Sequence, residues 1–146
     1  MLLQKIYRLL SFRDRSEKEI RDYLKNKTSK PEQIINQLKE QGYIDDEKFA
    51  REWVESRRRS KHKGIRAIKA ELWQKGIDKE IIEEVTGVEC LESSEEQIAE
   101  KALEKKAKAW QKLESMEFRK KATDFLMRKG FEYSVAKAVV DNFLEK

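Results

Sequence analysis

The sequence predicts an all-α protein built from three tandem three-helix repeats arranged as an elongated chain. Its 146 residues include five glycines and one proline, too few turn-forming residues for an all-β fold. A repeat is also visible, because Leu24, Leu72 and Leu126 each lie near the end of a second helix and are followed by KNK, WQKG and MRKG. One such unit is too small to be comfortably stable, so we expect neighbouring repeats to support one another.

The first repeat is expected over residues 1–44. An amphipathic segment from Leu2 to about Phe12 predicts its first helix. Two S-x-x-E motifs, the spacing of a capping box, predict the starts of the second and third helices: Ser16 with Glu19, and Ser29 with Glu32. Pro31 lies in the first turn of the third helix, where proline is tolerated, and Gly42 is expected to end that helix.

The second repeat is expected over residues 45–88. Asp45 or Asp46 suits the N-terminal end of its first helix, whose apolar stripe is formed by Phe49, Ala50, Trp53 and Val54. The second helix begins after Gly64, and its buried stripe is formed by Ile65, Ile68 and Leu72. Asp78 is expected to cap the third helix. Glycines are expected to end the three helices: Gly64, Gly76 and Gly87.

The third repeat is expected over residues 94–146, after a short acidic linker. The linker contains Cys90, whose acidic neighbours predict an unreactive thiol. A third S-x-x-E motif, Ser93 with Glu96, predicts a long helix that buries Ile98, Ala102 and Leu103. A further helix carries Phe118, Ala122, Phe125 and Leu126 and ends at Gly130, and a last helix extends over about 133–144.

Composition limits the class of protein. Charged residues make up 42% and apolar residues 38%, which predicts a thin core and a heavily solvated surface. The net charge is +5 and the pI is about 9.2. Cys90 is the single cysteine, so no disulfide forms within the chain, as expected in a reducing compartment. The sequence has no apolar run of about 18 residues and no secretory signal, so we expect a cytoplasmic protein with no membrane contact.

Positive charge is concentrated in the centre of the chain. Seven Lys or Arg and no acid lie between Ser56 and Ala70. Such a run suits nucleic acid, an acidic protein surface or anionic lipid, although many charge runs on helices are simply solvated faces. The candidate binding residues of this patch are Arg58, Arg59, Lys61, Lys63, Arg66, Lys69 and Trp73. The lysine-rich helix from Lys101 to Lys112 is the alternative surface.

The three consecutive arginines are not equivalent. At 100° per residue, Arg57 projects from the middle of the apolar stripe, so its stem is expected to lie on the core with its guanidinium at the helix end. Arg58 and Arg59 lie on the flanks and are expected to be free to meet a partner. Trp73 lies beside the buried stripe among cations, where it either forms a stacking platform or packs against another part of the chain.

The sequence contains no recognisable catalytic constellation. It has one histidine, His62, and no second histidine or nearby cysteine for a zinc site. It has no glycine-rich phosphate loop and no G-x-S-x-G motif. Asp45 and Asp46 are interpreted as helix caps rather than metal ligands. We therefore expect no enzyme, no metal and no cofactor.

The central residues resemble a known family. GYIDDEKFAREWVESR (42–57), KG (63–64) and ELWQKGI (71–77) are similar to the core signature of RecX regulatory proteins. RDRSEKEIRDYL (13–24) and FRKKATDFLMRKGF (118–131) resemble the first and third repeat motifs of that family. The first repeat departs from the family in having KNKT where a Lys-Gly turn is common, and contacts made by an N-terminal extension are not expected.

The resemblance implies a fold of three tandem three-helix repeats, similar to helix-turn-helix units, and a regulatory function. It implies that the protein binds the RecA recombinase filament on single-stranded DNA and mostly inhibits its ATPase, strand-exchange and coprotease activities. DNA binding by the protein alone is expected to be weak and non-specific, and the protein is expected to be a monomer. Two other hypotheses stay open: a helix-turn-helix transcription regulator, which would bind a specific duplex, and a helical adaptor, which would not depend on nucleic acid at all.

Overall fold

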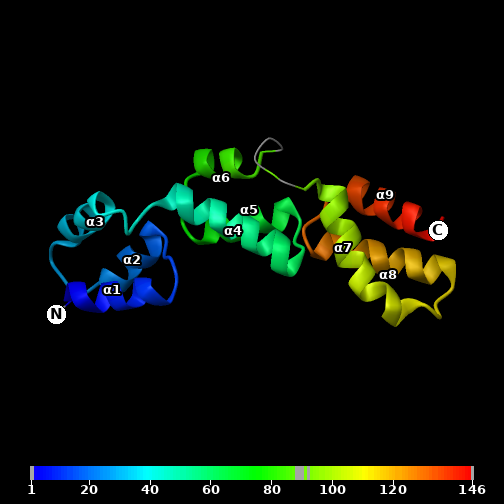
Figure 1. The fold of residues 1–146 in the computed structure, drawn as a ribbon, viewed down its shortest axis with the longest axis horizontal. Coiled ribbons are helices and arrows are strands. Elements are labelled where there is room, and N and C mark those ends of the chain that lie inside the picture. The colour runs from blue at the N-terminus through cyan, green and yellow to red at the C-terminus, as the bar shows by residue number, and fades with distance from the viewer. Residues whose placement is uncertain (1, 88–90, 92, 146) are drawn as a thin grey trace.

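The computed structural model describes residues 2–87, 91 and 93–145. Within these residues the chain forms nine α-helices and no strand, which confirms the predicted all-α class. Figure 1 shows three groups of helices in an elongated row, with the two termini at opposite ends. The helices of the three repeats are α1 (Leu2–Phe12), α2 (Glu17–Leu24) and α3 (Pro31–Glu40); α4 (Asp46–Lys61), α5 (Ile65–Gln74) and α6 (Lys79–Val85); and α7 (Glu95–Ala107), α8 (Ser115–Arg128) and α9 (Tyr133–Leu144).

Each repeat encloses a separate hydrophobic core. The core of the first repeat is formed by Ile6, Ile20, Leu24, Ile35, Leu38 and Ile44. In the second repeat, Ile68 and Leu72 are fully buried as predicted, whereas Ile65 is only half-buried. The third repeat has the largest core, which includes Phe118, Phe125 and Phe131, and a short 3₁₀ turn, η2 (Lys108–Trp110), extends α7. The expectation for Cys90 lies outside the described residues.

One of the three predicted capping boxes forms as expected. Ser16 accepts a hydrogen bond from the Glu19 amide, and the Glu19 side chain accepts one from the Ser16 amide. The box predicted at Ser29 and Glu32 is wrong, because Lys30 is the N-cap of α3 and makes no side-chain cap. The box predicted at Ser93 and Glu96 is wrong by one residue. The residues that form it are Ser94 and Gln97.

Left-handed backbone conformations mark the helix ends. Gly42, Gly76 and Gly130 have positive φ angles and follow α3, α5 and α8, as predicted. Gly64 does not end α4, which is a correction to the sequence prediction. His62 takes the left-handed conformation after α4, with φ 51°, and Gly64 is instead the N-cap of α5. Gly64 is therefore not needed for a left-handed backbone conformation, and its lack of a side chain instead permits close packing.

The first and second repeats meet where the N-terminus of α2 contacts the C-terminal turn of α5. The Ser16 hydroxyl donates to the Lys75 carbonyl oxygen at 2.7 Å. The Glu17 amide donates to Oδ1 of Asp46 at 2.9 Å. Burial raises the pKa of the Asp46 carboxyl, because the charged form loses hydration at this junction. The start of α2 is thus capped by residues of both repeats.

The second and third repeats meet in a closely similar way. The Gly64 amide donates to the Lys129 carbonyl oxygen at 2.8 Å, and the Arg66 amide donates to the Gly130 carbonyl oxygen at 3.2 Å. The Ile65 amide donates to Oε2 of Glu95 at 3.2 Å. Here too, the N-terminus of the second helix of one repeat, α5, lies on the C-terminal turn of the second helix of the next repeat, α8.

Both junctions use equivalent positions of the repeat. The acid at the first position of α4 or α7, Asp46 or Glu95, accepts from the first amide of the preceding second helix. The second residue of that helix is a cation that donates to main-chain carbonyls of the next repeat: Lys18 to Gln74, and Arg66 to Met127 and Phe131. Since the same contacts recur, the repeats extend head to tail rather than closing into one core.

Candidate nucleic-acid interface

Trp53 and Glu71 organise the cations on one side of the second repeat. The helical period places Arg57 one turn after Trp53, and its guanidinium carbon lies 4.1 Å from the indole ring centroid. Glu71 accepts a hydrogen bond from the Trp53 indole at 3.2 Å and pairs with the Lys63 ammonium at 2.6 Å. Lys75 lies 5.3 Å from the same ring. Arg57 is half-buried on Trp53, which agrees with the expectation for its stem.

Arg58 is buried, and the expectation that it is free to meet a partner is wrong. Only 5% of the residue is exposed. Its Nη1 pairs with Oε1 of Glu95 at 2.5 Å, and its Nη2 donates to the Ser93 carbonyl oxygen at 2.8 Å. On an isolated α4 this flank would be open, but the start of the third repeat covers it. Arg58 therefore holds α7 against α4.

The exposed candidates differ in how far they are engaged within the chain. Arg59 pairs with Glu55 on the same helix at 2.9 Å, and Lys69 lies 3.3 Å from Glu83. Lys61 is exposed and forms no ion pair within the described ranges. Surface pairs of this kind contribute little to stability, so Arg59 and Lys69 can exchange their partners at small cost.

Arg66 and Trp73 have opposite environments on α5. Arg66 donates to the carbonyl oxygens of Met127 at 3.0 Å and Phe131 at 3.4 Å, so part of its guanidinium serves the junction with the third repeat. Trp73 is 66% exposed, which argues against the alternative that it packs inside the protein. Its role as a stacking platform stays a prediction.

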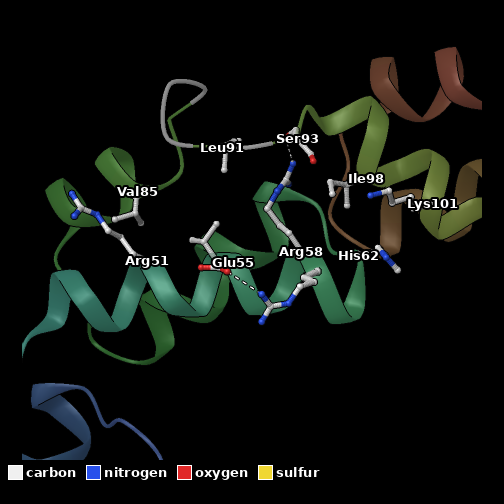
Figure 2. A pocket seen from close by; sticks show the side chains of 11 residues that line it. Arg51, Glu55, Arg58, His62, Val85, Leu91, Ser93, Ile98 and Lys101 are labelled. Carbon is white, nitrogen blue, oxygen red and sulfur yellow. Dashed lines mark hydrogen bonds and ion pairs between the residues drawn. The ribbon is translucent and has the colours of Figure 1, made fainter.

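A hollow of about 520 Å³ lies beside α4 at the junction of the second and third repeats. Figure 2 shows Arg51 and Val85 at one end of it and His62 and Lys101 at the other, with Arg58 reaching across to Ser93. Its apolar lining is formed by Val54, Val85, Leu91 and Ile98. Its basic lining is formed by Arg51, Arg58, Arg59, His62 and Lys101. The hollow thus combines an apolar wall with several cations.

Two basic groups at this junction have lowered pKa values. Burial lowers the pKa of His62, and Lys105, Lys129 and Lys101 lower it further. Burial also lowers the pKa of Lys129, and repulsion from Lys63 and from lysines of α7 and α4 lowers it further. Positive charge from both repeats therefore converges on one place.

Sequence reasoning missed Glu95 and Lys129 as junction residues. Both could have been found by aligning the repeats, since Asp46 and Glu95 begin equivalent helices and Lys75 and Lys129 precede equivalent glycines. Such an alignment shows equivalent positions, but it does not reveal that one repeat lies against the next at them. That information comes from the packing of the helices.

Two further properties concern the described part of the chain alone. No group of three or more His, Cys, Asp or Glu residues is arranged there to hold a metal ion. None of the helices there is both long enough and apolar enough to cross a membrane.

The chain matches family models over most of its length. Residues 3–38 match the first three-helix domain of RecX, residues 45–85 match the second, and residues 94–140 match the third. The three matches follow one another in the order of the family and correspond to the three groups of helices in Figure 1.

Curated relatives carry the same family name. The chain is 36% identical over 132 residues to "Regulatory protein RecX" of Streptococcus gordonii, which covers 88% of this chain and 50% of the relative. It is 35% identical over 135 residues to the protein of that name from Bacillus subtilis, covering 90% of this chain and 51% of the relative. The chain therefore spans about half the length of these relatives.

Solved structures share the fold. "Crystal structure of RecX from Lactobacillus salivarius" matches with a TM-score of 0.83 at 24% identity, covering 99% of this chain and 95% of that chain. "Crystal structure of regulatory protein RecX" matches with a TM-score of 0.79 at 25% identity, covering 95% and 70%. Three RecX domain models match the chain in order, and its relatives in sequence and in fold are RecX proteins. The chain therefore belongs to the RecX family.

Proposed function

We propose that this chain regulates the RecA recombinase. It binds the RecA filament on single-stranded DNA and mostly inhibits ATP hydrolysis, strand exchange and coprotease activity in recombination and DNA repair. The observation that carries the proposal is the match to all three RecX domains in order. Because the chain spans about half the length of its curated relatives, assigning a whole relative's activity to it is part of the proposal.

The shape of the molecule supports this function. A row of three repeats presents a long surface, as other repeat proteins do, and can contact several subunits of a helical filament. The proposed contact residues on the second repeat are Arg59, Lys61, Lys63, Lys69 and Trp73. Arg58 is removed from the predicted set because it is buried, and Arg66 contributes only what the third repeat leaves free.

Further expectations belong to the same proposal. The repeat boundaries at 1–44, 45–88 and 94–146, the monomeric state and the cytoplasmic location are proposed together with the function. DNA binding by the protein alone is weak and indifferent to sequence. If three to five phosphates are neutralised, the slope of log affinity against log salt on single strands is roughly −2 to −3.5.

A helix-turn-helix transcription regulator makes the opposite prediction. Such a protein reads base edges of one duplex sequence, usually as a symmetric dimer. Tight binding to one duplex that survives high salt would therefore favour that function. A helical adaptor for another protein would show no dependence on nucleic acid.

The deciding experiment measures RecA ATPase on single-stranded DNA with and without this protein. Inhibition that rises with protein concentration and saturates supports the proposal. A matched assay uses a DNA-dependent ATPase unrelated to RecA, because a protein that only sequesters DNA would inhibit both enzymes. Unchanged RecA turnover at all concentrations would refute the proposed regulation.

A further inference from the structure

Cations from three separate segments converge at the junction of the second and third repeats. Lys61 and His62 lie at the end of α4, Lys101 and Lys105 lie one turn apart on α7, and Lys129 follows α8. We name these five residues the junction cluster. Lys129 is fixed there, because its ammonium donates to the Lys61 carbonyl oxygen and its own carbonyl accepts from the Gly64 amide. His62 and Lys101 line the same hollow.

The four lysines of the junction cluster form no ion pair among the described residues. Glu55 lines the same hollow and pairs with Arg59. Glu95 is engaged by Arg58 and the Ile65 amide, and Glu71 is engaged by Lys63 and Trp53. Within the part of the chain that the structure describes, the junction therefore brings these lysines together without pairing them to an acid. Repulsion of this kind opposes docking of the two repeats, and an anion bound at the cluster would relieve it.

The lowered pKa values of His62 and Lys129 agree with this gathering of positive charge. Lys105, Lys129 and Lys101 add to burial in lowering the pKa of His62. The pKa of Lys129 is lowered by burial and then by Lys63, Lys105, Lys61 and Lys106. A solvated charge run on one helix would leave each cation separated from the others, whereas here the tertiary structure gathers them.

The geometry points to a phosphate-backbone site: the junction cluster binds single-stranded DNA across the second and third repeats. That the nucleic acid is single-stranded DNA rests on the proposed function. The site extends the proposed contact residues from the second repeat into the third. Lysine ammonium groups act as point charges that can follow a row of phosphates without requiring one fixed geometry. The cluster contains four lysines, and the choice of nucleic acid over an acidic protein surface rests on the apolar hollow beside them.

The adjoining hollow strengthens the choice of nucleic acid. Its apolar wall includes Val54, Val85 and Ile98, and its volume of about 520 Å³ lies in the range of small-molecule sites. A strand whose phosphates meet Lys101 and Lys105 can place a base against this wall. Single-strand sites in proteins combine these two features, a basic track and an apolar surface for bases.

The test compares two variants that lose the same charge. The cluster variant is Lys61→Gln with Lys101→Gln and Lys105→Gln. The control is Lys120→Gln with Lys121→Gln and Lys137→Gln, whose three lysines are exposed in the third repeat and lie outside the cluster. Fluorescence anisotropy with a labelled oligothymidylate measures binding at several salt concentrations, without RecA. RecA ATPase inhibition is measured separately.

We expect the cluster variant to bind the oligonucleotide about tenfold more weakly, with a salt slope shallower by roughly 2, since each lost phosphate contact removes about 0.7. The control should change little. Its thermal melting checks folding, and the cluster variant should melt at or above the wild-type temperature because repulsion is removed. Loss of DNA binding with RecA inhibition intact would still support the site, while separating it from the proposed function.

Three results would overturn the proposal. The first is equal weakening of DNA binding in the cluster and control variants. The second is an absence of oligonucleotide binding by the wild-type protein at low salt. The third is unchanged DNA binding by the cluster variant together with lost RecA inhibition. That last result would assign the cluster to an acidic protein surface and would leave the proposed function standing.

Discussion

Gly64 and Gly130 pack backbone against backbone at the junction of the second and third repeats. A Cβ atom on Gly64 would lie 2.3 Å from the Gly130 carbonyl carbon, and a Cβ atom on Gly130 would lie 2.4 Å from the Ala67 Cβ. Neither space can open by moving a flexible side chain, because main-chain atoms lie in the way at both positions. These two glycines let the main chains of the repeats approach closely enough for the Gly64 amide to reach Lys129.

We therefore expect Gly64→Ala to destabilise the docking of the third repeat, by about 1–3 kcal/mol, the usual cost of overpacking. Its backbone conformation suits alanine, since φ is −76°, so the cost arises from the contact alone. Gly87→Ala is the control, because the added Cβ meets nothing closer than 3.5 Å. Urea unfolding of both variants measures the difference. Equal midpoints would show that the close contact does not form in solution.

The buried Arg58 and the exposed Arg59 should respond very differently to the same substitution. Arg58→Met leaves Glu95 partly buried without its guanidinium, and removing one partner of a buried pair costs about 3–5 kcal/mol, less here because Glu95 is partly exposed. Arg59→Met should cost about 0.5 kcal/mol or less, because its pair with Glu55 is exposed. Denaturant unfolding compares the two. If Arg58→Met were as mild, the pair with Glu95 would not be a junction contact.

Two capping-box serines distinguish a simple helix cap from a junction contact. Ser94→Ala removes an exposed cap and should cost about 1 kcal/mol. Ser16→Ala should cost more, because the fully buried Ser16 hydroxyl also donates to Lys75 of the second repeat. Without the hydroxyl, the Lys75 carbonyl oxygen loses this hydrogen bond, which adds about 1–3 kcal/mol to the loss of stability. Thermal melting of both variants tests the order, and a reversed order would contradict the junction contact.

Leu72 and Trp73 are neighbours that separate folding from binding. Leu72→Ala should destabilise the protein by about 2–5 kcal/mol, because Leu72 is fully buried in the core of the second repeat. Trp73→Ala should melt within a few degrees of the wild type and weaken DNA or filament binding, since its exposed ring is a proposed stacking platform. Melting and RecA ATPase inhibition are measured together. A Trp73→Ala protein that inhibits as well as the wild type would remove this residue from the interface.

His62 should make oligonucleotide binding dependent on pH. Its pKa in the folded protein is below the ordinary 6.5, so without DNA the unfolded state binds more protons and stability falls as the pH drops below about 6.5. Bound phosphates favour the imidazolium, so affinity should rise over the same range and the salt slope should steepen by about 0.7. The charged groups around His62 are Lys61 and Lys63 beside it, Lys101 and Lys105 on α7, Lys129 after α8, and Arg59 and Glu55 along the hollow.

His62→Asn is the matched variant, because asparagine tolerates the left-handed conformation at this position. It should bind with the affinity of the wild type at pH 8 and lose the increase between pH 7 and pH 5.5. Anisotropy titrations across this range measure the effect. An increase of equal size in both proteins would assign the proton to another group.

The sequence by itself determined the helices and the grouping of their apolar residues. The stripe of Ile68 and Leu72 and the stop at Gly76 follow from local rules, namely the 3.6-residue period and the left-handed turn that glycine accepts. These rules act within one helix and its next few residues. They also yielded the repeat, because the same local pattern recurs along the chain.

Tertiary structure decided what lies on the flanks of those helices. Arg58 and Arg59 are adjacent on α4 and look alike in sequence, yet one is buried against Glu95 and the other is exposed. Likewise, Lys129 joins Lys61 only because the two turns dock, 68 residues apart along the chain. Burial, charge pairing and pKa depend on which repeat covers which face, and a helical period specifies a face without specifying its neighbour.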